Sequence, residues 1–127
     1  MKLLWIGAGG ALGSVARFLL DGWVQRWTAS AFPLGILVVN ASGSFAIGFV
    51  MTVLEARGLL DTTLRLGLVA GVLGGFTTYS SFNYQTLELF RARDWTNGTL
   101  NLGGTVVVCL AAGALGLAAG RWFSHAP

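Results

Sequence analysis

Three long stretches without a formally charged side chain constrain this 127-residue chain more than any other feature. They lie between Arg26 and Glu55, between Arg65 and Glu88, and between Asp94 and Arg121. Each exceeds the ~20 residues that a helix needs to cross a bilayer. A fourth apolar stretch runs from Leu3 to Ala16, and its helix continues through Arg17 only if that guanidinium faces protein or water, or snorkels. The sequence therefore predicts an all-α membrane protein with four transmembrane helices.

The composition agrees with a membrane protein, since 54% of the residues are hydrophobic, 10% are charged and the mean hydropathy is +0.70. The expected connecting segments, roughly residues 21–32, 55–64 and 90–96, are too short to hold a domain outside the membrane. We therefore expect residues 1–127 to form one four-helix transmembrane domain. Any activity must then be carried within the helices.

Several other classes of protein are disfavoured. The single cysteine, Cys109, lies in a predicted span and excludes a disulfide or thiolate–metal framework. The basic residues are scattered at helix ends, so we expect no nucleic acid as a partner. Gly7, Gly9 and Gly13 follow an apolar run as in a dinucleotide-binding turn, but the third glycine is one place late and no second strand with an acidic residue follows. The same segment resembles a signal peptide, but its glycine-rich packing face favours retention.

The basic residues divide evenly between the two sides of the membrane. Alternating the spans places four of the eight on each side: Lys2, Arg57, Arg65 and Arg121 against Arg17, Arg26, Arg91 and Arg93. The positive-inside rule orients a chain through an asymmetry that is missing here, so the chain can insert both ways. Coexisting orientations make available an antiparallel homodimer with its two-fold axis in the membrane plane. We therefore predict dual topology.

The third apolar stretch contains two glycines followed by a cluster of hydroxyl side chains, Gly74 to Ser81, at mid-membrane depth. A helix that breaks there exposes backbone polar groups that lipid does not satisfy, so they must line a cavity, bind an ion or pack against protein. Such a break usually marks a permeation site in a membrane protein. We therefore predict a third helix that is broken in mid-membrane.

Small residues recur every four positions and predict close helix packing, as at Gly9 and Gly13 and at Gly67, Gly71 and Gly75. Polar side chains recur in the same way. Asn97, Asn101, Thr105 and Cys109 form one stripe along the fourth helix, and Tyr79 and Phe82 share a face of the third.

These polar side chains are neutral, and no carboxylate lies among them. Neutral donors, aromatic ring edges and the positive end of the half-helix after the break suit an anion, whereas carbonyls freed on the other side of the break suit a small hard cation such as sodium. Proton-coupled antiport generally needs an intramembrane ionisable group. The pattern therefore favours a passive anion pathway over a pump.

At these residues the chain resembles the Fluc family of bacterial fluoride channels, and the resemblance runs nearly end to end. The run from Gly71 to Phe82 is similar to the family pattern GxxGGxTT-aromatic-S-[ST]-F and is the most specific part. Residues 9–13 followed by Arg17 resemble the first-helix motif of the family, and residues 33–48 resemble the second.

The resemblance implies a dual-topology antiparallel homodimer in the bacterial cytoplasmic (inner) membrane, with two pores that export fluoride passively and no enzymatic activity. It also implies a structural sodium ion at the dimer interface, held by backbone carbonyls of Gly74 and Thr77. For fluoride itself it implies ring edges from Tyr79 and Phe82 and an amide from Asn40. A hydroxyl track would continue through Ser80, Ser81 and Thr105, with Asn101 on the same stripe as Thr105, and Arg17 would lie near the pore entrance.

The chain departs from the family pattern at three positions. Tyr79 stands where phenylalanine is usual, Gln85 where a glutamate usually lies, and Asn101 where the fourth helix usually has tyrosine. Two other classes stay open at this point. A small multidrug exporter shares the length and helix count but needs a carboxylate in its first helix, where this chain has glycine, alanine and leucine. A purely structural membrane subunit explains the glycine faces but not the ordered polar stripes.

Overall fold

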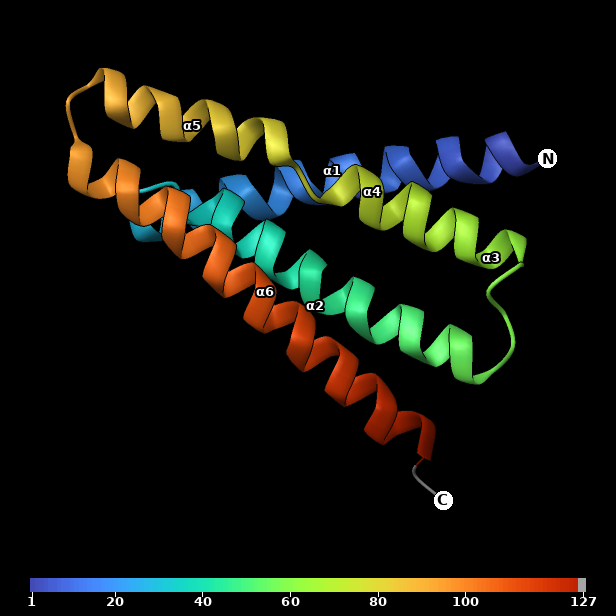
Figure 1. Ribbon diagram of the computed structural model, residues 1–127. Helices are drawn as coiled ribbons and strands as arrows, with labels where there is room; N and C mark the ends of the chain where they lie inside the picture. Colours follow the sequence, from blue (N-terminus) through green and yellow to red (C-terminus); the bar gives the residue numbers. More distant parts are fainter. Residues whose placement is uncertain (126–127) are drawn as a thin grey trace.

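The computed structural model describes residues 1–125 and is all-helical, as predicted (Figure 1). Three continuous helices are long and apolar enough to cross a membrane. They are α1 (Lys2–Thr28), α2 (Leu34–Ala56) and α6 (Trp95–His125). The remaining span is divided into consecutive pieces, namely α3 (Thr63–Arg65), the π-helix η1 (Leu66–Leu73), α4 (Gly74–Phe76) and α5 (Tyr79–Arg91). The third helix is therefore broken, which is why no single piece of it is long enough to span alone.

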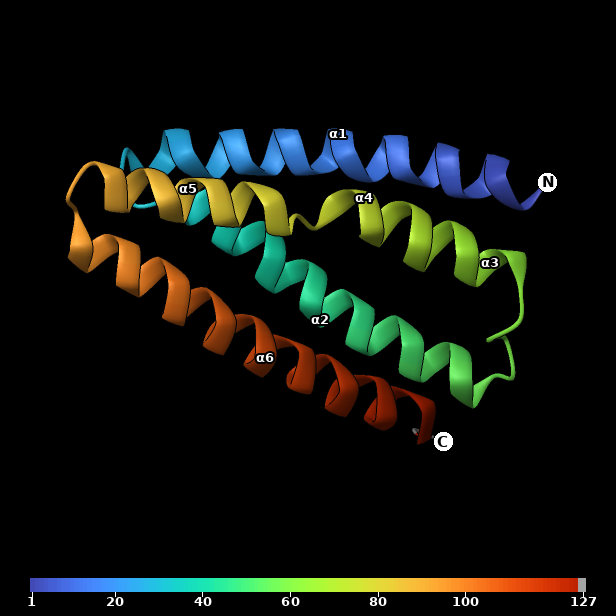
Figure 2. The ribbon, with the colours of Figure 1, turned by 45° about the horizontal axis from the view of Figure 1, so that its top comes forward.

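The break lies just after the two glycines. Gly74 keeps right-handed helical angles, and Gly75 belongs to the same helical turn. Thr77 and Thr78 are instead extended, with ψ values of 154° and 113°. Figure 2 shows this short non-helical connection between α4 and α5. Because helical angles continue through both glycines, their role is to allow close packing rather than to supply unusual backbone angles.

Helix α1 is longer than the sequence indicated. Residues 21–28 were expected to begin the first connection, but they continue the helix to Thr28. A helix of 27 residues is about 40 Å long, so its end extends beyond a hydrocarbon core of about 30 Å. The charged side chains in this last part therefore need not interrupt it. Ala29, with φ 45°, ends the helix, and the Gln25 amide donates to the Ser30 carbonyl at 2.6 Å across the short connection.

Glycine contacts hold the helices together at very short range. A Cβ on Gly75 would lie 2.5 Å from the carbonyl oxygen of Gly10 and 3.0 Å from its Cα. A Cβ on Gly48 would lie 2.6 Å from the Gly113 carbonyl oxygen. The first contact joins the third span to α1 and the second joins α2 to α6. The close packing predicted from the spacing of Gly67, Gly71 and Gly75 is confirmed, and the structure identifies α1 as the partner helix.

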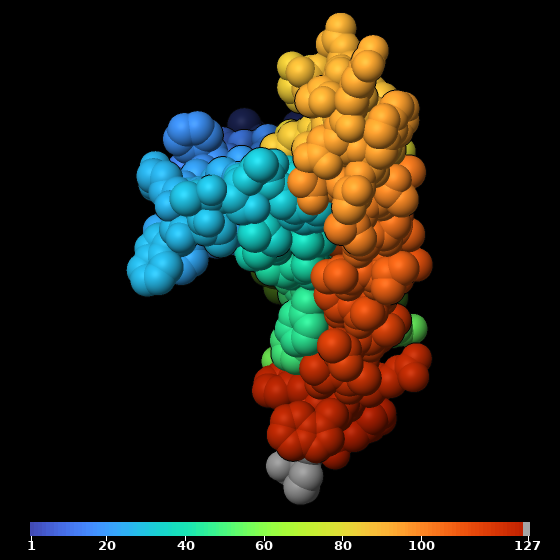
Figure 3. Space-filling view, turned by 90° about the vertical axis from the view of Figure 1, so that its left-hand side faces the viewer, coloured from blue at the N-terminus to red at the C-terminus, as the bar shows by residue number. Residues whose placement is uncertain are grey.

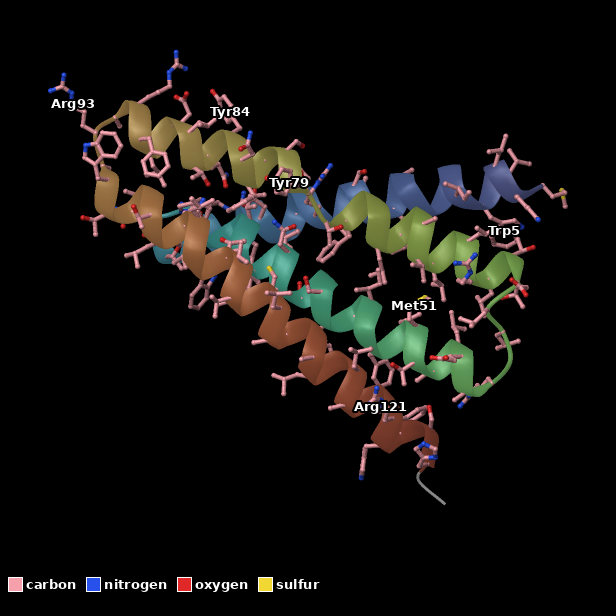
Figure 4. The ribbon with its side chains drawn as sticks, in the orientation of Figure 1. Trp5, Met51, Tyr79, Tyr84, Arg93 and Arg121 are labelled. Carbon is pink, nitrogen blue, oxygen red and sulfur yellow. The ribbon has the colours of Figure 1, made fainter. Side chains whose placement is uncertain are left out.

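The ends of the elements alternate between two sides of the molecule. The N-terminus, the α2–α3 connection and the end of α6 lie on one side, whereas the α1–α2 and α5–α6 connections lie on the other (Figures 1 and 2). Arg93 and Arg121 accordingly lie at opposite ends (Figure 4). Figure 3 shows the molecule from the end that holds Arg93. In this view the α1–α2 connection projects away from the column formed by α5 and α6.

Candidate functional site

The break is held by a reciprocal pair of hydrogen bonds from α2. The Asn40 Nδ2 group donates to the Thr78 carbonyl oxygen at 3.0 Å, and the Thr78 backbone N–H donates to Asn40 Oδ1 at 2.8 Å. Both residues are buried. One side-chain amide thus replaces the peptide partners that the extended segment loses, as buried backbone groups require.

The hydroxyl of Thr78 then begins α5. Thr78 Oγ1 accepts the Ser81 backbone N–H at 3.2 Å, as an N-cap side chain does. The same hydroxyl donates to Ser81 Oγ at 3.1 Å and lies 3.2 Å from Ser80 Oγ. The sequence indicated a hydroxyl cluster here, but it did not identify Thr78 as its centre.

These two sets of hydrogen bonds free two carbonyl groups. In an uninterrupted helix, the Thr78 N–H would donate to the Gly74 carbonyl and the Ser81 N–H to the Thr77 carbonyl. Both N–H groups donate to side-chain oxygens instead. The carbonyls of Gly74 and Thr77, which the resemblance implies as sodium ligands, thereby lose their helical partners. Gly74 is also exposed.

A cavity of about 380 Å³ lies beside the break. It is lined by parts of α2, the broken third span and α6, and it brings together most of the predicted site residues: Asn40, Gly74, Thr77, Tyr79, Phe82 and Thr105. Ser44, Thr78 and Cys109 also line it. None of the described residues that line the cavity carries a charged side chain.

Tyr79 and Phe82 form an aromatic pair at this cavity. Their ring centroids are 5.6 Å apart and their planes are inclined at 59°, close to an edge-to-face arrangement. Phe82 is only 5% exposed, whereas Tyr79 is 77% exposed. Figure 4 shows Tyr79 beside the break between α4 and α5. One ring is therefore fixed within the chain, and the other is available to a neighbouring molecule.

Asn101 does not line this cavity. It is 2% exposed and lies between α5 and α6, where its Nδ2 donates to Thr86 Oγ1 at 2.8 Å. Thr105 Oγ1 donates to Asn101 Oδ1 at 3.3 Å. Sequence reasoning missed Thr86, although it lies four residues after Phe82 and hence on the same helix face.

Ser80 and Ser81 line a separate, smaller cavity of about 330 Å³ with Asp21, Tyr84 and Gln85. Within the described part of the chain, the buried Gln85 Oε1 has no hydrogen-bond partner. Arg17 lines neither cavity; it is half-buried on α1, four residues before Asp21. The two serines and the arginine, like Asn101, are therefore separate from the cavity that holds most of the predicted residues.

Comparisons with known proteins agree with this architecture. Residues 4–117 match the family described as CrcB-like protein, Camphor Resistance (CrcB). Three similar proteins all carry the name fluoride-specific ion channel FluC. One from Sorangium cellulosum is 48% identical over 94% of each chain, and one from Opitutus terrae is 51% identical over 89% of this chain and 87% of its own. A third, from Anaeromyxobacter dehalogenans, is 45% identical over 97% of this chain and 98% of its own.

These relatives are named as ion channels and not as enzymes, and they match this chain over nearly its whole length. The four-helix architecture, the apolar spans and the broken third helix described above fit such a multi-pass membrane protein. The chain belongs to the CrcB family of membrane proteins, the family of the FluC channels.

Proposed function

We propose that this protein is a fluoride-specific channel through which fluoride leaves the bacterial cytoplasm passively. The observation that carries the proposal is the uncharged cavity beside the break, where Asn40, Phe82 and Thr105 converge. The full-length relatives named as fluoride-specific channels support the choice of ion. Because no carboxylate lines the cavity among the described residues, a passive route fits better than a proton-coupled one.

The chemical task of such a channel is to replace the water around a small, strongly hydrated anion. The cavity offers several weak donors rather than one strong cationic site. Asn40 uses one of its two amide N–H groups on Thr78, which leaves the second for an anion. The edge of the Phe82 ring adds a positive rim, and the N-terminal end of α5 adds the positive end of a helix dipole. Weak binding at several points allows an ion to enter and to leave.

We further propose that two copies of the chain pair in antiparallel orientation in the cytoplasmic (inner) membrane. In a single chain, the exposed Gly74 and the 77% exposed Tyr79 would face lipid beside the freed carbonyls of the break. Lipid does not satisfy such backbone groups, so a second chain that covers them is favoured. The even division of basic residues between the two ends allows the partner to insert the other way. Each dimer would then contain two fluoride pores.

The freed carbonyls of Gly74 and Thr77 would hold the sodium ion between the two chains. Their oxygens fit a small hard cation, because carbonyl oxygen is a preferred ligand of such ions and both groups have lost their helical donors. The exposure of Gly74 leaves this point open to the partner. When bound, sodium would supply positive charge that joins the two breaks without itself permeating.

The proposed function is tested by fluoride efflux from vesicles that contain the purified protein. We expect fluoride, measured with a selective electrode, to leave the vesicles while chloride stays. Cys109, the only cysteine, lines the cavity, so a reagent that binds its thiol tests whether fluoride passes through the cavity. Silver ions should therefore block efflux through the natural chain but not through Cys109→Ser.

Equal fluxes of chloride and fluoride would defeat the proposed selectivity. Efflux that silver blocks equally in the Cys109→Ser variant would place the route outside the described cavity. Vesicles without protein control for leakage of hydrogen fluoride across the lipid.

Replacement of sodium by N-methyl-D-glucamine on both sides of the membrane tests the proposed ion. We expect efflux to fall roughly tenfold, because an ion present at about ten times its dissociation constant stabilises the assembled form by about 1.4 kcal/mol. Ionic strength and the fluoride gradient are kept constant, and returning sodium should restore the flux. A rate that does not depend on sodium would remove the ion from the proposal and leave fluoride conduction intact.

A further inference from the structure

Three hydrogen bonds form a chain that leads from the cavity into the contact between α5 and α6. Thr105 Oγ1 donates to Asn101 Oδ1 at 3.3 Å, Asn101 Nδ2 donates to Thr86 Oγ1 at 2.8 Å, and Thr86 Oγ1 donates to the Phe82 carbonyl oxygen at 2.8 Å. Thr86, Asn101 and Thr105 are all buried, so water does not easily replace any member.

Elementary chemistry determines the direction of this chain. The Phe82 carbonyl is only an acceptor, so the hydroxyl of Thr86 must supply the proton between them. Thr86 Oγ1 then has no second proton and must accept from the amide group of Asn101. The remaining atom of that side chain is therefore the carbonyl oxygen, which accepts from Thr105. The single hydroxyl proton of Thr105 thus points toward Asn101.

This direction matters because Thr105 lines the cavity and Asn101 does not. While Thr105 donates to Asn101, its oxygen offers only lone pairs to the cavity, and lone pairs repel an anion. To bind fluoride, the hydroxyl must release Asn101 and turn its proton toward the ion. The bond that must break is the longest of the three, and so the weakest by geometry.

We propose that Asn101 is a positioning residue that competes with the permeating fluoride for the hydroxyl proton of Thr105. This inference rests on the proposed fluoride conduction and adds a determinant of binding strength at the same cavity. An anion that takes the proton leaves Asn101 Oδ1 buried without a partner, which opposes binding. Asn101 therefore keeps the binding of fluoride at Thr105 weak and favours rapid exit of the ion.

The decisive experiment measures single-channel current in planar bilayers over a range of fluoride concentrations for the natural chain and for Asn101→Leu. Leucine has a similar volume but accepts no proton from Thr105. We expect the half-saturating fluoride concentration to fall about tenfold, the factor that corresponds to one hydrogen bond no longer lost on binding. The maximal current should also fall, because a tighter site releases the ion more slowly. A wild-type half-saturating concentration in this variant would overturn the inference.

A double-mutant cycle separates this role from a structural one. If Asn101 acts through the Thr105 hydroxyl, then Asn101→Leu has no further effect on half-saturation in a Thr105→Val background. Equal effects in both backgrounds would contradict the proposed route. Thr52→Val is the matched control, since it removes a buried hydroxyl that donates to the Gly48 carbonyl at 2.8 Å outside the cavity. We expect its current to equal that of the natural chain.

Thr86 provides a second test, which decides the matter if Asn101→Leu does not fold. Thr86→Val removes the acceptor that orients the Asn101 amide. The half-saturating fluoride concentration should therefore fall, as it should in Asn101→Leu. Thr86→Ser keeps the hydroxyl and should retain the natural value; a valine variant that behaves like the serine variant would overturn the inference. If the natural chain passes no fluoride, the proposed function itself fails. A conducting natural chain with unchanged Asn101 and Thr86 variants refutes only the inference.

Discussion

Asn40→Asp is expected to reduce fluoride efflux by about a hundredfold, which corresponds to about 2.7 kcal/mol of lost stabilisation in the conducting path. The physical reason is double. The new carboxylate no longer donates to the Thr78 carbonyl, which Asn40 Nδ2 reaches at 3.0 Å, so two acceptors face each other in a buried place. Its negative charge also lies at the wall of a cavity proposed to carry an anion. Efflux from vesicles at equal protein density measures the loss.

Asn97→Asp is the matched control for that substitution. Asn97 also uses its Nδ2 group as a donor, to Asp94 at 2.7 Å, but it lies in the first turn of α6 and outside the cavity. The new carboxylate would lie beside that of Asp94, but both residues are half-exposed at the beginning of α6, where water and the positive end of the helix dipole reduce the repulsion. We expect this variant to keep most of the natural flux. Similar rates for the two aspartate variants would mean that charge at Asn40 does not affect conduction.

Gly75→Ala is expected to lower the free energy of unfolding by about 3 kcal/mol, at the upper end of the cost of overpacking. The added methyl group would lie 2.5 Å from the Gly10 carbonyl oxygen and 3.0 Å from Gly10 Cα. These atoms belong to the backbone of α1, so no side chain can turn aside and the two helices must separate. Unfolding in mixed detergent micelles, followed by tryptophan fluorescence, gives the change in stability.

Gly103→Ala provides the comparison on α6, where a Cβ would meet no atom of residues 1–125 within 4 Å. Alanine is better than glycine in a helix interior by up to about 1 kcal/mol, so this variant should be as stable as the natural chain or slightly more stable. If Gly75→Ala proved as stable as Gly103→Ala, the close contact between α1 and the third span would not contribute to stability.

Much of the fold could be predicted from the positions of the charged residues along the sequence. The charge-free stretches indicate α2 and α6 because the cost of burying charge in lipid acts on each segment alone. The break was expected within the run from Gly74 to Ser81 and lies inside it, at Thr77 and Thr78. The two glycines stay helical and pack closely, because small residues in lipid favour close packing as well as bending. The predicted end of helix α1 came before the observed end at Thr28. The reason is that Asp21 and Arg26 indicate where a span leaves the membrane but not where the helix stops.

The cavity was less accessible to sequence reasoning because its bonds join distant segments. Asn40 and Thr78 are 38 positions apart, and no local pattern indicates that the side-chain amide of Asn40 binds the backbone N–H and carbonyl of Thr78. Asn101 was grouped with Thr105 from their spacing, yet the partner that determines its burial, Thr86, comes from another helix. The π-helix η1 likewise has no signal in the sequence that we could identify.

The pairing of Asn40 with Thr78 has a consequence for how the chain is made. Helix α2 leaves the ribosome before the third span, so the amide that completes the break is already in place when the later segment enters the bilayer. The carbonyl and N–H groups of Thr78 therefore need not wait in hydrocarbon for a partner that has not yet been synthesised. The order of the elements along the chain thus provides a hydrogen-bond partner for Thr78 while the third span inserts into the membrane.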